Sequence, residues 1–259
     1  MKRISTIIIL FVFLAACQKE KVDVPIVEVP EGSLKLISSY QLDILEPSGI
    51  SFGPDGQTLL IVSDNANMVY ETNLEGEIIR TLNYVGADLE GVVYNPDENI
   101  VALAEERLRE IVLLDYEVGN EIGRYPINVE NNNDNKGLEG LSYNLNNKAY
   151  YIVNEDLPGE LIVWNPKFGI IEKKELHFAI DYSAIFVDDL NSILWILSDD
   201  SQTMYKCDYK ANVLMEFILP RTKYEGLIVD VDLMKAYYVN DATAKLEVFD
   251  IEISISKGS

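Results

Sequence analysis

Carboxylate side chains recur at fixed positions along this 259-residue chain, on both sides of a repeated small residue. The small residue occurs at Gly49, Gly91, Gly140, Ala184 and Gly226. Fifteen residues after each of these comes an acid: Asp64, Glu106, Glu155, Asp199 and Asp241. A hydroxyl or acidic residue directly precedes each small one: Ser48, Glu90, Glu139, Ser183 and Glu225. Ten polar positions, eight of them carboxylates, therefore follow one pattern.

Carboxylates brought close together raise one another's pKa and destabilise a fold unless a cation or hydrogen bonds compensate. Calcium is the cation that suits them, because it takes about six to eight oxygen ligands in flexible geometry. We predict a calcium site with these ligands: Glu90, Glu139, Glu225, Glu106 and Glu155. Asn154 and Asn240, each just before an acid, are candidates for additional carbonyl oxygens.

A purely structural role is the alternative for these acids, since repeat carboxylates often accept backbone N–H groups in turns. We expect this role for the three aspartates, Asp64, Asp199 and Asp241, because aspartate is short and favoured in turns. Zinc is disfavoured by the donor set, which offers one histidine, His177, and few cysteines.

The elements that would hold these acids are strands. The small residues are 42, 49, 44 and 42 positions apart, a period typical of propeller blades. Each is followed by turn residues and then by a strongly apolar run: 59–62, 100–104, 149–153, 193–197 and 236–239. Further alternating runs follow, such as 110–115 with 121–127, and 161–164 with 170–178. The pattern predicts four strands in each repeat and no long helix after residue 32.

The two ends of the chain complete the predicted ring. The fifth repeat stops after its third strand, 245–253, while a spare strand, 33–42, precedes the first repeat. Placing the spare strand on the outside of the last blade leaves no open edge. We therefore expect an all-β, five-bladed β-propeller closed by an N-terminal strand, over residues 33–259. In such a blade the first strand begins, and the second ends, on the same face, so the ten polar positions should meet at one mouth of the channel.

The N-terminal sequence is typical of a secretory signal peptide. Residues 1–16 combine Lys2 and Arg3 with an apolar run that is shorter than a spanning helix needs. The run ends in Leu-Ala-Ala-Cys17, which resembles a bacterial lipobox, so we expect Cys17 to be lipidated. The alternative is an ordinary signal peptide with a chance cysteine. Residues 17–32, charged and containing Pro25 and Pro30, are the expected flexible tether. This predicts a lipid-anchored protein of the bacterial cell envelope, at the outer membrane.

The net charge and the cysteine count limit the classes of partner that we expect. The formal net charge of −22 repels nucleic acid and anionic lipid, and it suits a cation, a cationic partner or solubility alone. With Cys17 acylated, Cys207 has no partner for an intramolecular disulfide and is expected to be a small buried hydrophobe. We expect a monomer.

The motifs of the first three repeats resemble the SdiA-regulated protein family over about residues 35–253. The resemblance is carried by EPSG at 46–49, SDN at 63–65, DLEG at 88–91, EER at 105–107, GLEG at 137–140, and Asn154, Glu155 and Pro158. It implies a five-bladed propeller with a calcium site, distantly similar to NHL-repeat proteins, and no defined activity. The fourth repeat departs from the pattern, with Ser183-Ala184 in place of Glu-Gly.

Catalysis by a Ser-His-Asp triad is disfavoured, since the sequence lacks a G-x-S-x-G elbow and His177 lies on an expected outer strand. We expect a binding or scaffold module for an unknown small molecule or protein. The alternative is a calcium-dependent hydrolase, resembling lactonases or phytases, with a glutamate as general base.

Overall fold

Strands make up nearly all the regular structure of this protein. The computed structural model describes residues 29–130, 133, 136–155 and 158–253. One 3₁₀ turn, η1 (Pro54–Gly56), is the only helical element among these residues. No helix in this part of the chain has the length and apolar character that a membrane span requires.

Three sheets contain four consecutive antiparallel strands each. The first is β2 (Pro47–Phe52), β3 (Leu59–Ser63), β4 (Met68–Thr72) and β5 (Ile78–Val85). The second is β6 (Leu89–Asn95), β7 (Ile100–Glu105), β8 (Glu110–Asp115) and β9 (Glu121–Pro126). The third is β10 (Leu138–Asn144), β11 (Ala149–Asn154), β12 (Glu160–Asn165) and β13 (Gly169–Glu175).

The fourth sheet has eight strands in the order β14-β15-β16-β17-β1-β20-β19-β18. Their bounds are β14 (Ala184–Asp188), β15 (Ile193–Ser198), β16 (Thr203–Asp208), β17 (Val213–Ile218), β1 (Glu31–Gln41), β20 (Lys245–Glu252), β19 (Lys235–Asn240) and β18 (Tyr224–Asp230). The N-terminal strand β1 lies in the middle of this order. It is antiparallel to β20, with Ser33 opposite Glu252, and parallel to β17, with Glu31 opposite Glu216.

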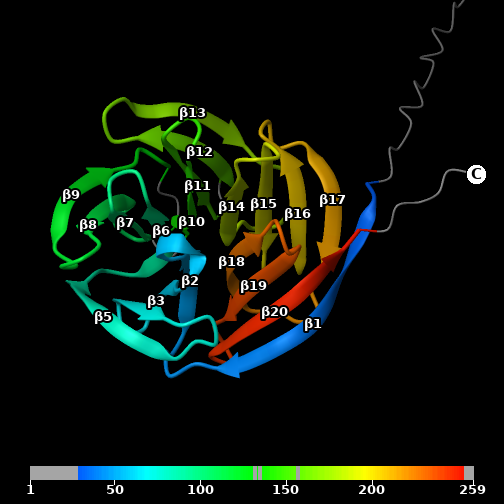
Figure 1. Ribbon diagram of the computed structural model, residues 1–259. Coiled ribbons are helices and arrows are strands. Elements are labelled where there is room, and N and C mark those ends of the chain that lie inside the picture. The colour runs from blue at the N-terminus through cyan, green and yellow to red at the C-terminus, as the bar shows by residue number, and fades with distance from the viewer. Residues whose placement is uncertain (1–28, 131–132, 134–135, 156–157, 254–259) are drawn as a thin grey trace, which may run out of the picture.

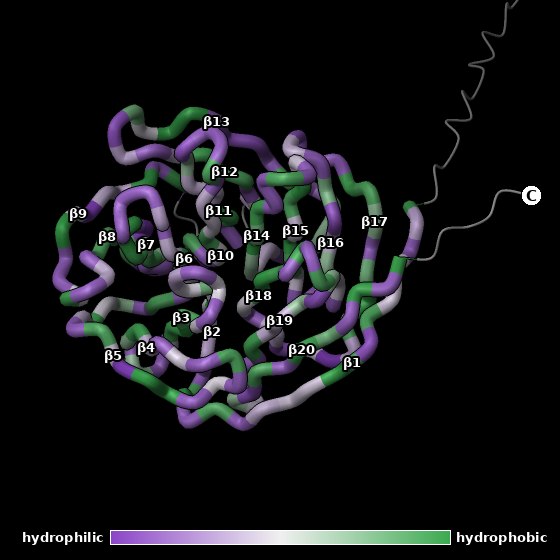
Figure 2. Tube along the Cα trace, in the orientation of Figure 1, coloured by the Kyte–Doolittle hydropathy of each residue, from purple (hydrophilic) through white to green (hydrophobic). Residues whose placement is uncertain are grey.

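A ring of inner strands organises the whole molecule. β2, β6, β10, β14 and β18 contact one another in that order, and β18 contacts β2 again. Figure 1 shows the remaining strands fanning outward from this ring, which is the architecture of a β-propeller. The strands next to the ring, such as β3 and β7, are buried along their whole length because neighbouring sheets cover both faces. In Figure 2 the hydrophobic stretches follow strands, and the turns between them are largely hydrophilic.

The expected strands agree with the observed ones to within about two residues at most ends. The closing strand pairs with β20 as predicted, but it begins at Glu31, so the last two residues expected in the tether belong to the sheet. Its parallel pairing with β17 was not predicted. The strand expected over 170–178 ends at Glu175, because Leu176 turns into the core and its N–H donates to Gly159 O at 2.8 Å. The signal at 1–16 and Cys17 lie outside the described residues.

Candidate metal centre

All ten predicted polar positions line one cavity of about 270 Å³. It lies where the inner strands begin and the second strands end, and we call it the acidic mouth. Three further residues line it that the repeat pattern had not singled out: Asp181, Asp200 and Lys223. The prediction that the ten positions converge on one face of the ring is therefore confirmed.

β-Bulges turn the side chain of the residue before the glycine toward the acidic mouth. In the second sheet Leu89 pairs with Glu105 and Gly91 pairs with Ala104, so Glu90 is an extra residue without an opposite partner. Glu225 is the extra residue in the same way, between Tyr224 and Gly226. A bulge bends the strand and re-aims a side chain, and bulges are frequent beside functional sites. The carboxylates of both glutamates consequently face the mouth instead of following the strand's alternation.

Close approach of neighbouring inner strands explains the repeated small residue. A Cβ atom built on Gly91 would lie 2.3 Å from the carbonyl oxygen of Glu139 in the next sheet. The same atom on Gly49 would lie 2.2 Å from the carbonyl oxygen of Glu90. Any side chain here would push adjacent strands apart, and with them the glutamates that face the mouth.

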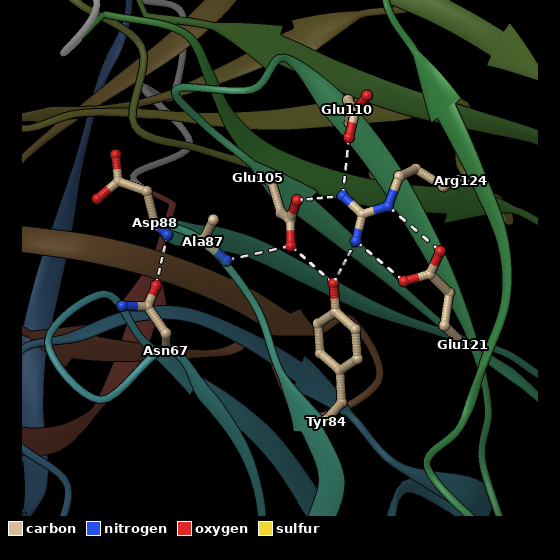
Figure 3. Close-up of polar contacts among 8 residues, drawn as sticks. All are labelled: Asn67, Tyr84, Ala87, Asp88, Glu105, Glu110, Glu121 and Arg124. Atoms are coloured by element: carbon tan, nitrogen blue, oxygen red, sulfur yellow. Dashed lines mark hydrogen bonds and ion pairs between the residues drawn. The ribbon is translucent and has the colours of Figure 1, made fainter.

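The loop before β6 is fixed by a polar network shown in Figure 3. The carboxylate of Glu105, 1% exposed, accepts the N–H of Ala87 at 3.1 Å and pairs with Arg124 at 2.5 Å. The Asp88 N–H donates to the side-chain oxygen of Asn67 in the neighbouring sheet. Asp88 itself has a φ of +58°, a left-handed conformation that is strained for a non-glycine residue. These contacts hold Asp88 and the start of β6 at the edge of the mouth.

Basic side chains neutralise part of the mouth. Lys223 Nζ lies 3.2 Å from Asp199 and 3.4 Å from Glu225. Lys136 Nζ lies 3.1 Å from Glu155, and Arg107 Nε lies 2.8 Å from Asp88. Glu90, Glu106 and Glu139 form no ion pair with a basic side chain among the residues that the structure describes.

The carboxyl groups of these three glutamates have strongly raised pKa values. Burial is the main cause for Glu139, followed by the charges of Glu90 and Glu106, and its pKa lies well above the ordinary range. Burial and the charge of Asp64 act in the same way on the pKa of Glu90. The pKa of Glu106 rises from 4.5 to about 8, through burial and then through its hydrogen bond with Asp88. Three negative charges here are therefore unfavourable without a compensating cation.

Two sets of three carboxylates have the geometry of a cation site. Each set offers oxygens that all lie within 4.8 Å of one another: Asp88, Glu90 and Glu106, and Glu106, Glu139 and Glu155. Oxygens that bind one calcium ion at about 2.3–2.6 Å are at most about 5 Å apart, so either set fits. Glu106 belongs to both sets. No histidine or cysteine lines the mouth among the described residues, which leaves an all-oxygen donor set suited to a hard cation.

The predicted ligands divide into two groups. Glu90, Glu139, Glu106 and Glu155 belong to the two sets, whereas Glu225 belongs to neither and lies 3.4 Å from Lys223 Nζ. Asp88 joins the first set and was missed, because the bulge at Glu90 breaks the alternation that would relate the two side chains.

Two of the three aspartates have the structural role expected of them, and all three also line the mouth. The Asp199 carboxylate accepts the backbone N–H of Lys223 from the next repeat. Asp64 also has a backbone hydrogen bond, from Asn65, while its Oδ1 is buried and has no hydrogen-bond partner among the described residues. Its pKa is raised to about 6, mainly by burial, so Asp64 offers the mouth another oxygen. Asp241 also lines the mouth, and burial raises its pKa.

The asparagines and the histidine lie elsewhere. Asn240 accepts the N–H of Thr243 at 3.0 Å and donates to Thr222 O at 2.8 Å, so its amide already serves the turn after β19. Asn154 donates to Pro158 O at 2.8 Å, and neither asparagine lines the mouth. His177 lies just beyond the end of β13 and away from the mouth, with its side chain 78% exposed.

Fold and site together define a β-propeller whose central channel has one acidic mouth. The family model of the SdiA-regulated proteins matches residues 36–232, and the chain belongs to that family. Among solved structures, a streptogramin B lyase is similar with a TM-score of 0.51 and 15% identity, over 81% of this chain and 71% of that one. Hydrazine synthase from Kuenenia stuttgartiensis is similar with a TM-score of 0.53 and 14% identity, over 77% of this chain and 57% of that one. At these identities the similarity extends to the fold alone.

Proposed function

We propose that this protein is a lipid-anchored, five-bladed propeller that binds calcium at the acidic mouth and acts as a binding module in the bacterial envelope. One observation carries the proposal: Glu90, Glu106 and Glu139 converge around the mouth without a basic partner among the described residues. Their raised pKa values mean that the ionised carboxylates are unfavourable in the metal-free mouth, and a bound hard cation would stabilise them.

Backbone strain at the mouth supports a ligand role for this face. Glu46, Asp88 and Lys223 occupy the same position in three repeats, three residues before the small one, and all have positive φ values, of 46°, 58° and 67°. Such conformations cost about 1 kcal/mol or more each, and they cluster at binding sites. The buried Asp64 Oδ1 adds an oxygen that lacks a partner among the described residues.

The way in which β1 completes the eight-stranded sheet supports the proposed count of five blades. β14 to β17 form one complete blade within that sheet, and β18 to β20 form a second that lacks its outer strand. β1 supplies the missing strand by pairing with β20. Together with the three four-stranded sheets, this arrangement supports five blades around the ring of inner strands.

Calcium titration tests the metal. After treatment with EDTA, we expect added calcium to raise the melting temperature, because a ligand bound only by the folded state stabilises it. In Glu106→Gln the gain should shrink strongly, since Glu106 belongs to both carboxylate sets. Glu98→Gln, which removes one exposed acid elsewhere, is the matched control and should respond like the wild type. An unchanged melting temperature in the wild type would refute the calcium site.

The lipid anchor has its own test. We expect radiolabelled fatty acid to be incorporated into the wild-type chain in bacterial cells, and the protein to fractionate with membranes. In Cys17→Ser both properties should be lost, because no other cysteine lies beside the signal. Release of the wild type as a soluble protein without label would refute the anchor and leave the calcium site untouched.

A further inference from the structure

A second cavity, of about 320 Å³, lies at the opposite ends of the inner strands. Residues from β2, β6, β10, β14 and β18 all contribute to it, near the ends at which these strands leave the ring. We call it the apolar mouth, because side chains such as Ile50, Leu141 and Ile185 form much of its wall. Its volume equals that of about ten water molecules, which is enough for one aromatic ring with a short chain.

Aromatic side chains from four inner strands line the apolar mouth: Phe52, Tyr94, Tyr143 and Phe186. Two leucines of its rim are unusually open to solvent, with Leu190 80% and Leu145 43% exposed. Exposed leucines beside an apolar cavity favour a ligand that covers them when it binds. Several aromatic rings around one cavity also suit a cation, since ring faces attract positive charge.

The charges around the apolar mouth are negative. Asp55, Asp188 and Asp189 line it, and none of its described lining residues is a lysine, arginine or histidine. Asp188 is occupied by Asn191, whose backbone and side-chain N–H groups donate to it at 3.1 and 2.8 Å. Asp55 is exposed on the turn after β2, and its charge adds to burial in raising the pKa of Tyr94. Asp189 Oδ2 accepts the Leu145 N–H at 2.9 Å; burial raises the pKa of Asp189, and the charge of Lys148, which lies 2.7 Å from Asp97, opposes this.

The two mouths are separate sites. Ser48 faces the acidic mouth and Ile50 the apolar one, with Gly49 between them, and the third sheet repeats this order at Glu139, Gly140 and Leu141. The close approach of inner strands at the glycines separates the two cavities. A ligand of the apolar mouth therefore does not need the carboxylates of the acidic mouth.

We propose that the apolar mouth binds a small organic cation, with an aromatic or aliphatic body among the aromatic side chains and its ammonium group near Asp55 and Asp189. The cavity, its aromatic lining and its uniformly negative charge all favour such a ligand, and none of them depends on calcium. A neutral ligand would leave the carboxylates unused, and an anionic ligand would be repelled by them.

Three probes of one shape test the charge preference: 2-phenylethylammonium, 2-phenylethanol and 3-phenylpropionate. We expect the cation to bind to the full chain most tightly, the alcohol about fivefold more weakly, and the carboxylate more weakly still. Nuclear Overhauser effects from the ring of the cation to the labelled methyl groups of Ile50 and Ile185 should place it in the apolar mouth. Equal affinity for all three probes would overturn the proposal.

Charge-removing variants locate the ammonium group. Asp55→Asn keeps a residue that tolerates the positive φ of 55°, and Asp189→Asn keeps the shape of the side chain. Each should weaken the cation about fivefold and leave the alcohol unchanged. Asp232→Asn, an exposed acid in the turn after β18, is the control and should change neither. If Glu106→Gln abolished binding while these variants did not, the cation would occupy the acidic mouth and the proposal would fail.

Discussion

The metal-free protein should lose stability as the pH rises from 5 to 8, and we assign much of this loss to the carboxyl group of Glu106. The folded state holds the Glu106 proton up to about pH 8, whereas an unfolded glutamate releases it near its ordinary pKa of 4.5. Between these values the folded state binds more protons, so raising the pH favours unfolding. The pKa of Glu225, raised to about 7 mainly by burial, acts in the same direction.

The size of the effect follows from the pKa difference. For Glu106 alone, linkage over pH 5 to 8 gives roughly 3.5 kcal/mol, and screening by water at the open mouth reduces the expected loss to about 2 kcal/mol. That is a large share of the 5–15 kcal/mol of stability that is typical of folded domains. In Glu106→Gln this contribution disappears, while the amide oxygen can still accept the Gly137 N–H that Glu106 accepts at 3.1 Å.

Urea unfolding in EDTA at pH 5, 6, 7 and 8 measures this, with the buried Trp164 and Trp195 as fluorescent reporters. We expect the free energy of unfolding of the wild type to fall with pH, and that of Glu106→Gln to fall by about 2 kcal/mol less. Glu98→Gln should behave like the wild type. A metal-free wild type that is equally stable at pH 5 and pH 8, or a slope shared by Glu106→Gln, would refute the reasoning.

Three further substitutions probe the packing that supports the mouth, each measured by urea unfolding. Gly91→Ala should destabilise the fold by about 3 kcal/mol and weaken calcium binding, because the new Cβ would lie 2.3 Å from a backbone oxygen. An unaltered calcium affinity would argue against coupling between strand packing at Gly91 and the metal site. Arg124→Leu should lose about 3 kcal/mol, since it leaves the Glu105 carboxylate buried without its ion pair, and Glu105→Gln in the same chain should recover part of this. Cys207→Ser should lose about 2 kcal/mol by burying a hydroxyl among apolar side chains, and a neutral result would mean that the hydroxyl finds a partner.

Much of the acidic mouth could be predicted from spacing alone. A constant offset between two residues in every repeat fixes their relation in every blade, which is why Glu90 and Glu106 were expected on one face. The bulge at Glu90 could not be predicted from the sequence, because inserting an extra residue into a strand does not change which residue types surround it. Lys223 was overlooked because it occupies a position where other repeats carry acids or glycine, and the bulge at Glu225 breaks the alternation that would relate the two side chains.

Long-range pairing was the least predictable part of the fold. The closure of the ring by residues 33–42 could be predicted by counting strands. The fifth repeat has only three expected strands, and the strand at 33–42 belongs to no repeat. Contact between β1 and β17 has no such signal, because it is a parallel pairing over two residue pairs only. The end of β13 was misplaced for a related reason, since the apolar Leu176 extends the strand pattern while it packs in the core.

The position of β1 between β17 and β20 has a consequence for the order of folding. The hydroxyl of Ser33 bonds to Glu252, 219 positions along the chain, so β1 finds this neighbour only after nearly the whole domain has been synthesised. Until then the last blade is incomplete, with an open strand edge that invites aggregation. Ring closure should therefore be the slow step, as pairings distant in sequence generally are. In a permuted chain, in which residues 31–41 follow residue 252, the same contact becomes a local hairpin, and folding should be faster at nearly unchanged stability.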